Sequence, residues 1–164
     1  MIFLTVGTLF PFDRLVKAVD IAIKNQLIQR RVFAQIGPSD FKPKHMEYTN
    51  HMDRDAFEET IHTTTALISH AGIGSIAMGL KYNKPLLVMP RKRKYREHVN
   101  DHQVGTAKMF ERLGHVLVAY SETDLPKKIQ LLPTFKASPR ENQAHVIARR
   151  IAVFLDQITP DIIV

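Results

Sequence analysis

The sequence of 164 residues contains no cysteine, which excludes a disulfide framework and a thiolate metal site. This absence fits a cytoplasmic protein, and we expect that location. The sequence also lacks any apolar run near the roughly 20 residues that cross a bilayer, so we expect any membrane association to be peripheral. The apolar opening segment 1–6 has no basic start and is too short for a signal peptide.

Familiar ligand-binding motifs are missing as well. No Gly-Lys-Ser or Gly-Lys-Thr occurs, so the chain has no Walker loop. The usual dinucleotide fingerprint belongs after the first strand, where the chain has only the segment GTLFP at 7–11. There is no recognised nucleic-acid motif and no convincing carboxylate cluster for a metal. We therefore expect neither nucleic acid nor a metal or other cofactor.

What is present is the composition of a globular protein, with 45% apolar and 24% charged residues. The length predicts one domain over residues 1–164. The formal net charge is +7, and Lys or Arg occupies five of the six positions 91–96. A solvated loop is one interpretation. Its position after an apolar strand favours acidic phospholipid or a phosphate-bearing substrate, contacted by Arg91, Arg93 and Arg96.

Strand and helix patterns alternate along the chain. Apolar runs predict strands at 2–6, 32–36, 46–49, 65–69, 86–89 and 116–119. Apolar periodicity predicts one helix that begins near 11 and others over about 53–62, 75–82, 101–113, 121–132 and 139–157. Asp53 and Ser121 are the candidate capping residues of two of them. Such alternation predicts the α/β class, with a Rossmann-like parallel sheet flanked by helices. Ligands in these folds bind beyond the carboxyl ends of the strands. The segments 7–8, 70–75 and 91–103 and Gly37 all follow strand ends, so we expect them to meet at one edge of the sheet.

The turn at 69–75 is the most informative feature. An apolar strand ends at Ser69-His70, and Gly72-x-Gly74-Ser75 opens a helical pattern. A helix begins with unpaired N–H groups and a partial positive charge, and glycine lets a phosphate approach the main chain. A tight connection without a ligand is the alternative. His70 before the turn and the DHQ triplet at 101–103 favour a nucleotide-diphosphate site.

Four segments carry a resemblance to a known family: TVGT with FPFDRLVKAVD, ISHAGIGS, KPLLVMPR and EHVNDHQ. Together they resemble the donor half of a GT-B glycosyltransferase, in particular the C-terminal domain of family-28 enzymes. They are similar to the soluble subunit of the two-subunit N-acetylglucosaminyltransferase of dolichol-linked glycan assembly. The basic segment RKRKYREHVNDHQ is also similar to PssE-type proteins of bacterial capsule and exopolysaccharide synthesis.

The resemblance implies a role for each matching residue. The donor diphosphate would bind at His70, Gly72, Gly74 and Ser75. The donor sugar would face Asp101, His102 and Gln103. The cleft would include Gly7, Thr8 and His98, although a plain turn is the alternative at Gly7-Thr8. Fixed N–H donors and cations would stabilise the charge that grows on a leaving UDP.

One residue departs from the family pattern. Many relatives carry a glutamate three residues after the turn serine, where it holds the ribose hydroxyls, and this chain has Met78 there. Methionine is only a weak acceptor. Ribose contacts are therefore expected from elsewhere, or donor binding depends on a partner.

A complete GT-B enzyme has two such domains, so the resemblance implies a second polypeptide that supplies the acceptor site and the general base. In the resembling systems that partner is membrane-anchored and the acceptor is a sugar on a polyprenyl diphosphate. The prediction is a UDP-sugar-dependent, inverting hexosyltransferase subunit, held by its partner at the inner face of the plasma membrane. A non-catalytic enhancer subunit is the alternative, and a lone nucleotide-sugar-modifying enzyme is disfavoured by the length. The helix at 139–157 is predicted either to dock the partner or to be the last core helix.

Overall fold

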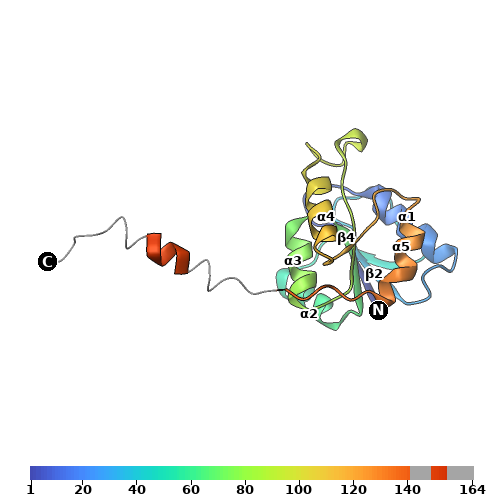
Figure 1. The fold of residues 1–164 in the computed structure, drawn as a ribbon. Coiled ribbons are helices and arrows are strands. Elements are labelled where there is room, and N and C mark those ends of the chain that lie inside the picture. Colours follow the sequence, from blue (N-terminus) through green and yellow to red (C-terminus); the bar gives the residue numbers. More distant parts are fainter. Residues whose placement is uncertain (141–148, 155–164) are drawn as a thin grey trace.

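The computed structural model describes residues 1–140 and 149–154 (Figure 1). Within these residues it contains a six-stranded sheet of order β3-β2-β1-β4-β5-β6, and every neighbouring pair is parallel. The strands are β1 (Ile2–Thr5), β2 (Val32–Gln35), β3 (Glu47–Thr49), β4 (Ala66–His70), β5 (Leu86–Met89) and β6 (Leu117–Val118). The predicted parallel α/β fold is confirmed.

Helices cover both faces of the sheet (Figure 1). One face carries α1 (Asp13–Lys24) and α5 (Leu125–Leu131), and the other carries α2 (Arg54–Thr63), α3 (Ile73–Lys81) and α4 (His102–Arg112). Successive side chains of a strand point to opposite faces, so Leu4 belongs to the first core cluster and Phe3 to the second. This two-sided burial explains why the strands are continuously apolar.

Local signals place most helix starts. The carboxylate of Asp53 accepts a hydrogen bond from the Ala56 N–H at 2.8 Å and caps α2, as predicted. The helix α3 begins at Ile73, two residues before the predicted start. The helix α5 begins four residues after Ser121, because Ser121 first forms a turn in which its hydroxyl accepts the Asp124 N–H.

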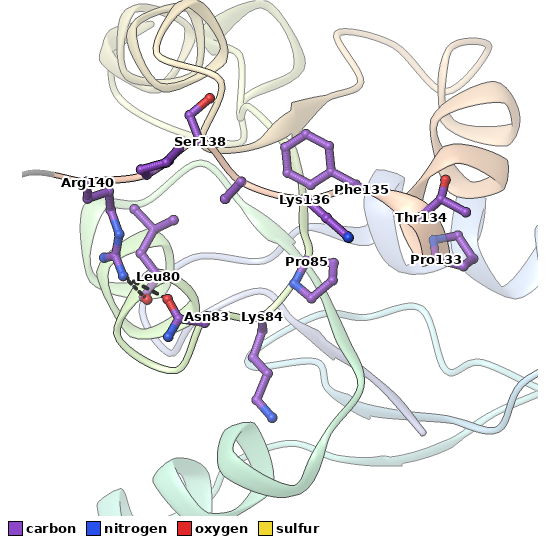
Figure 2. Close-up of a pocket in the computed structure, with 12 residues that line it drawn as sticks. Leu80, Asn83, Lys84, Pro85, Pro133, Thr134, Phe135, Lys136, Ser138 and Arg140 are labelled. Atoms are coloured by element: carbon purple, nitrogen blue, oxygen red, sulfur yellow. Dashed lines mark hydrogen bonds between the residues drawn. The ribbon is translucent and has the colours of Figure 1, made fainter.

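The chain after α5 crosses back toward the C-terminus of α3. Arg140 donates hydrogen bonds there to the carbonyl of Leu80 and, at 3.2 Å, to the side chain of Asn83. A groove of about 910 Å³ lies between this segment and the amino end of β5, away from the predicted site (Figure 2). Of the predicted helix at 139–157, residues 139–140 are not helical and 149–154 are helical; the others lie outside the described residues.

The strand order creates a switch point between β1 and β4. The chain moves outward from β1 through β2 to β3, and outward in the other direction from β4 through β5 to β6. Connections on the two sides therefore diverge at the carboxyl ends of β1 and β4, where parallel folds bind ligands. No helix of the described residues is long and apolar enough to cross a membrane.

Candidate functional site

The switch point brings together the turn after β1 and the turn after β4, with His70 between them. A methyl group added at Gly7 would lie 3.1 Å from Cε1 of His70, and one at Gly72 would lie less than 3.0 Å from its Nε2. Both glycines therefore leave room for the imidazole. Gly7 also has φ +78°, a conformation that other residues rarely adopt.

The N-terminus of α3 is open toward solvent at the same edge. Gly72 is its N-cap, the first helical hydrogen bond is from Ile76 N–H to the Gly72 carbonyl at 3.1 Å, and no side chain among the described residues caps it. A methyl group added at Gly74 would meet no atom within 4 Å. The first N–H groups of a helix have no intrahelical partner, so an anion can approach them here.

His70 is neutral at pH 7 in this setting. Burial, followed by the positive charge of Arg91 and by His98, lowers the pKa of His70 from 6.5 to about 4. A neutral imidazole offers one N–H donor and one lone pair. The residue predicted to line the diphosphate site therefore contributes hydrogen bonding and shape, while the charge comes from elsewhere.

Arg91 places a buried positive charge near the turn after β1. Its Nη2 donates to the carbonyls of Val6 and Phe10 at 2.6 Å each, and its guanidinium lies 4.9 Å from the ring centroid of Phe12. Burial lowers the pKa of Arg91 to about 10, which leaves it charged at pH 7. The buried position corrects its predicted contact with lipid or acceptor phosphate. Arg91 instead shapes the turn after β1.

The DHQ triplet divides between two tasks. Gln103 is buried, and its Oε1 accepts the Arg91 N–H at 3.2 Å, so burial corrects its predicted exposure to the sugar. Asp101 is exposed, and its Oδ1 accepts the Arg93 N–H at 2.8 Å. His102 is also exposed at the start of α4, where the side chain of Asn100 contacts its Nδ1. The predicted contact of Asp101 and His102 with the donor sugar stays a prediction.

Three rings line up beside this triplet. The ring centroids of Phe10 and His98 are 4.9 Å apart, and those of His98 and His102 are 4.6 Å apart. Partial burial lowers the pKa of His98, with His102 and Arg91 adding to the effect. The ring of His98 thus joins the turn after β1 to the start of α4, and its predicted place in a cleft stays a prediction. Phe10 was not among the predicted site residues.

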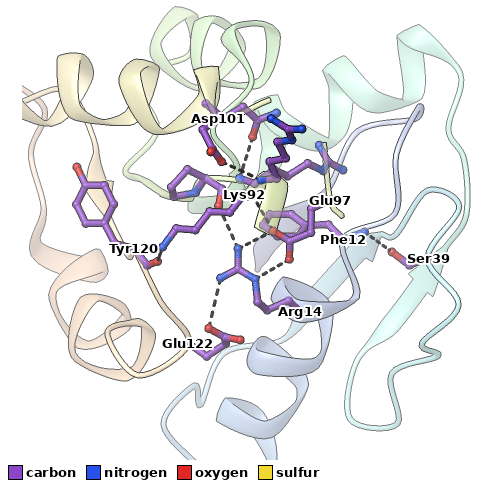
Figure 3. A network of polar contacts seen from close by, with 12 residues as sticks. Phe12, Arg14, Ser39, Lys92, Glu97, Asp101, Tyr120 and Glu122 are labelled. Atoms are coloured by element: carbon purple, nitrogen blue, oxygen red, sulfur yellow. Dashed lines mark hydrogen bonds and ion pairs between the residues drawn. The ribbon is translucent and has the colours of Figure 1, made fainter. Parts of the chain in front are cut away.

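An ion pair fixes the segment between β5 and α4 (Figure 3). Arg14 of α1 binds both carboxylate oxygens of Glu97 at 2.6 and 2.8 Å, and both side chains are less than 10% exposed. Arg14 also donates to the Pro90 carbonyl and pairs with Glu122. Sequence reasoning missed this pair. Its signal was the single acidic residue in the segment 91–100.

The remaining residues predicted for the site differ in exposure. Thr8 and Gly74 are exposed, Ser75 is half-buried, and Arg93 and Arg96 are exposed. Met78 is half-buried and packs against the second core cluster. Within residues 1–140 and 149–154, no three His, Asp or Glu residues are grouped so that they could hold a metal ion.

Comparison with known proteins shows which family the sequence matches. The model of the glycosyltransferase family 28 C-terminal domain matches residues 1–158. The human protein "UDP-N-acetylglucosamine transferase subunit ALG13" is 32% identical over 124 residues, which are 70% of this chain and 10% of the human protein. The protein of the same name from Cryptococcus neoformans is 38% identical over 98 residues, 58% of this chain and 43% of that protein. The chain thus spans less than half of the length of these relatives.

Solved structures share the fold. The NMR solution structure of ALG13 has a TM-score of 0.61 at 22% identity and covers 92% of this chain and 93% of its own. The glycosyltransferase of kitacinnamycin has a TM-score of 0.60 at 18% identity, covering 93% of this chain and 37% of its own. Acinetobacter baumannii MurG has a TM-score of 0.56 at 17% identity, covering 80% and 40%. The chain therefore has the fold of one half of a GT-B glycosyltransferase, as predicted.

Proposed function

Because the chain belongs to the family of glycosyltransferase family 28 C-terminal domains, we propose that it is the donor-binding subunit of a two-component glycosyltransferase. The observation that carries the proposal is the uncapped N-terminus of α3 at the switch point, beside an empty approach at Gly74. A UDP-sugar would place its diphosphate on the N–H groups of residues 73–75. The relatives named UDP-N-acetylglucosamine transferase subunits support UDP as the nucleotide.

The chemistry follows from the charges around the turn. Breaking the bond between the sugar and the phosphate leaves negative charge on UDP, and donors fixed before the reaction stabilise it without reorganisation. The N–H groups of α3 supply the donors. The guanidinium of Arg91 adds positive charge from a position where solvent screens it little, and neutral His70 offers an N–H or a lone pair beside it.

The sugar would lie toward the start of α4. Asp101 and His102 are exposed there, and His98 links them to the turn after β1. Ribose contacts are not expected from Met78, which packs against the core. We propose that a partner completes the nucleotide site, so that the chain alone binds the donor weakly.

The partner would supply the acceptor site and the general base. We propose a membrane-anchored polypeptide, an acceptor linked to a polyprenyl diphosphate, and a location at the inner face of the plasma membrane in bacterial polysaccharide synthesis of the PssE type. The helical residues 149–154 carry three exposed apolar side chains for docking this partner, Ile151, Val153 and Phe154. The transfer would be inverting and would move a hexose.

Reconstitution tests the proposal. Sugar transfer is measured with the chain alone, with its membrane partner, and with Gly74→Asp in the complex. We expect transfer only from the complex, and a loss of at least 100-fold in Gly74→Asp, because a carboxylate beside the helix N-terminus repels the diphosphate. The matched control is Gln130→Asp, which adds a carboxylate at an exposed helical position of α5, away from the turn after β4.

Full transfer by the Gly74→Asp complex would reject the donor site. The enhancer alternative is separated by nucleotide binding: a pure enhancer need not bind UDP. Transfer that depends on the chain, without UDP binding at residues 73–75, would favour the enhancer role.

A further inference from the structure

The segment 91–100, named here the basic loop, projects past the carboxyl ends of the strands between β5 and α4 (Figure 1). A short 3-10 turn at Arg93–Tyr95 ends at Arg96, which has a left-handed conformation with φ +58°. Arg93, Lys94, Tyr95 and Arg96 are all exposed. The loop thus presents three cations around one aromatic ring.

The acidic residue of the basic loop does not offset these cations at the surface. Glu97 is buried, both its oxygens bind Arg14, and its Oε2 also accepts the Lys92 N–H at 2.9 Å (Figure 3). The Arg14 guanidinium also lies 4.6 Å from the ring centroid of Tyr95. Among residues 1–140 and 149–154, neither Arg93, Lys94 nor Arg96 pairs with a carboxylate. The ion pair therefore fixes the backbone and leaves the exposed face cationic.

Apolar side chains accompany the cations. Leu9 is 82% exposed and Val99 is 70% exposed. Their chain neighbours Phe10 and His98 have rings in contact, which brings Leu9 and Val99 to the same part of the surface. Contact of large apolar side chains with water is unfavourable, so burial of both side chains in one interface would be favourable.

A groove adds a place for an anionic group. It has a volume of about 460 Å³, lies between the basic loop and α4, and is lined by Lys92, Lys94 and Lys108 together with Asp101, Val104 and Gly105. The ammonium of Lys92 donates to the Tyr120 carbonyl, and the two other lysines, Lys94 and Lys108, against one carboxylate favour a phosphate.

We propose that the basic loop, with Leu9 and Val99, is a surface that binds an anionic lipid bilayer directly. Cations in this arrangement are attracted to acidic headgroups, Tyr95 suits the interfacial region, and the two aliphatic side chains enter the acyl boundary. The net charge of +7 agrees with a negatively charged surface as the occupant. The inference goes beyond the proposed function, because the chain would contact lipid without its partner and close to its own candidate site.

Vesicle flotation of the purified full-length chain tests this surface. One set of vesicles contains 30% phosphatidylglycerol in phosphatidylcholine, and the other contains phosphatidylcholine alone. We expect binding to the anionic vesicles only. The variant Arg93→Gln/Lys94→Gln/Arg96→Gln should bind them roughly 100-fold more weakly, from the usual contribution of each basic residue near such a surface. The variant Leu9→Ser/Val99→Ser should weaken the binding that persists in 0.5 M salt.

The matched control removes three exposed cations elsewhere, in Lys24→Gln/Lys127→Gln/Lys136→Gln. We expect it to bind within about threefold of the parent chain, because distant charges are screened. Thermal unfolding checks that each variant is folded. Equal binding to both vesicle types, equal weakening by both triple variants, or no binding to either vesicle would overturn the proposal and leave the surface to a protein partner. The assay contains no nucleotide, so its outcome is independent of UDP binding.

Discussion

The turn after β4 and the basic loop after β5 leave neighbouring strands at the same edge of the sheet, but they treat their polar groups in opposite ways. The turn ends in a helix whose N-terminus no described side chain caps, beside a glycine with empty space around it. In the basic loop and the start of α4 that follows it, Glu97, Asp101 and Gln103 all accept hydrogen bonds from the protein itself.

This difference distinguishes groups that can bind a ligand from groups that support the backbone. Groups that the protein leaves open at the switch point can take a ligand, whereas groups that it uses internally hold a loop in place. Adjacent residues of the DHQ triplet differ in this respect: Gln103 accepts a backbone hydrogen bond, and His102 is exposed. The comparison predicts that changes to the internally bonded groups alter stability, and that changes beside the open N–H groups of the turn alter nucleotide binding.

The largest expected effect is the loss of Glu97. The variant Glu97→Ala leaves Arg14 buried without its main partner, and breaking a buried pair typically costs about 3–5 kcal/mol. Urea unfolding measures the change in the free energy of unfolding. The control is Glu122→Ala, which removes a half-exposed partner of the same arginine and should cost less than about 1 kcal/mol. Equal losses in both variants would contradict a supporting role specific to Glu97.

Next in size is Gly72→Ala. An added methyl group would overlap the His70 imidazole, and overpacking of this kind typically costs about 1–3 kcal/mol. Chemical denaturation of Gly72→Ala and of Gly72→Ala/His70→Ala separates the causes. The second variant should be destabilised by less than the sum of its single changes, because removing the ring removes the clash. Additive effects would show that the ring and the turn are not in contact.

The pH dependence of stability reports on His70. Its pKa is about 4 in the folded chain and 6.5 without burial, so the unfolded chain binds more protons between these values. The stabilisation is complete above about pH 6.5 and is lost as the pH falls toward 4. Between pH 7 and pH 5, the parent chain should lose about 2 kcal/mol more than His70→Gln does. Parallel pH profiles of the two proteins would contradict a buried, neutral His70.

The smallest stability effect is the most specific. Gly74→Ala and Gly105→Ala each replace a helical glycine with empty surroundings, so each should stabilise the fold by about 0.5–1 kcal/mol. Only Gly74→Ala should weaken UDP binding, because its methyl group faces the approach to α3. Calorimetric titration with UDP makes the comparison. A similar loss of UDP affinity in both variants would remove the basis for placing the diphosphate at this turn.

The fold was predictable because its signals are local. Apolar runs that end at glycine turns predict the strands, and Asp53 marks the start of α2. Two helix starts differ from the predicted ones. Ser121 forms a turn, so α5 begins after it, and α3 begins directly after Gly72 rather than at the predicted Ser75. The end strand β6 is two residues long, against the four predicted, with a single neighbour to pair with.

The site was predictable as a place and only partly as a set of contacts. Residues that follow parallel strands must meet at one edge, so His70 and Gly7 were expected together. The direction of a side chain is not encoded by its neighbours in sequence. Arg91 is buried and Arg93 is exposed, although both lie in one run of basic residues. The partner of Glu97 is 83 residues away, and the sequence alone gave no way to choose Arg14.

The most direct test of the donor site is an NMR titration of the full-length chain with UDP, which detects weak binding residue by residue. We expect the amide signals of Ile73, Gly74 and Ser75 to shift most and those of Gly7 and Thr8 to follow, and we expect Gly74→Ala to reduce all of these shifts. No shift at these amides at millimolar UDP, or shifts confined to the basic loop, would contradict the assignment of the turn after β4 as the diphosphate site.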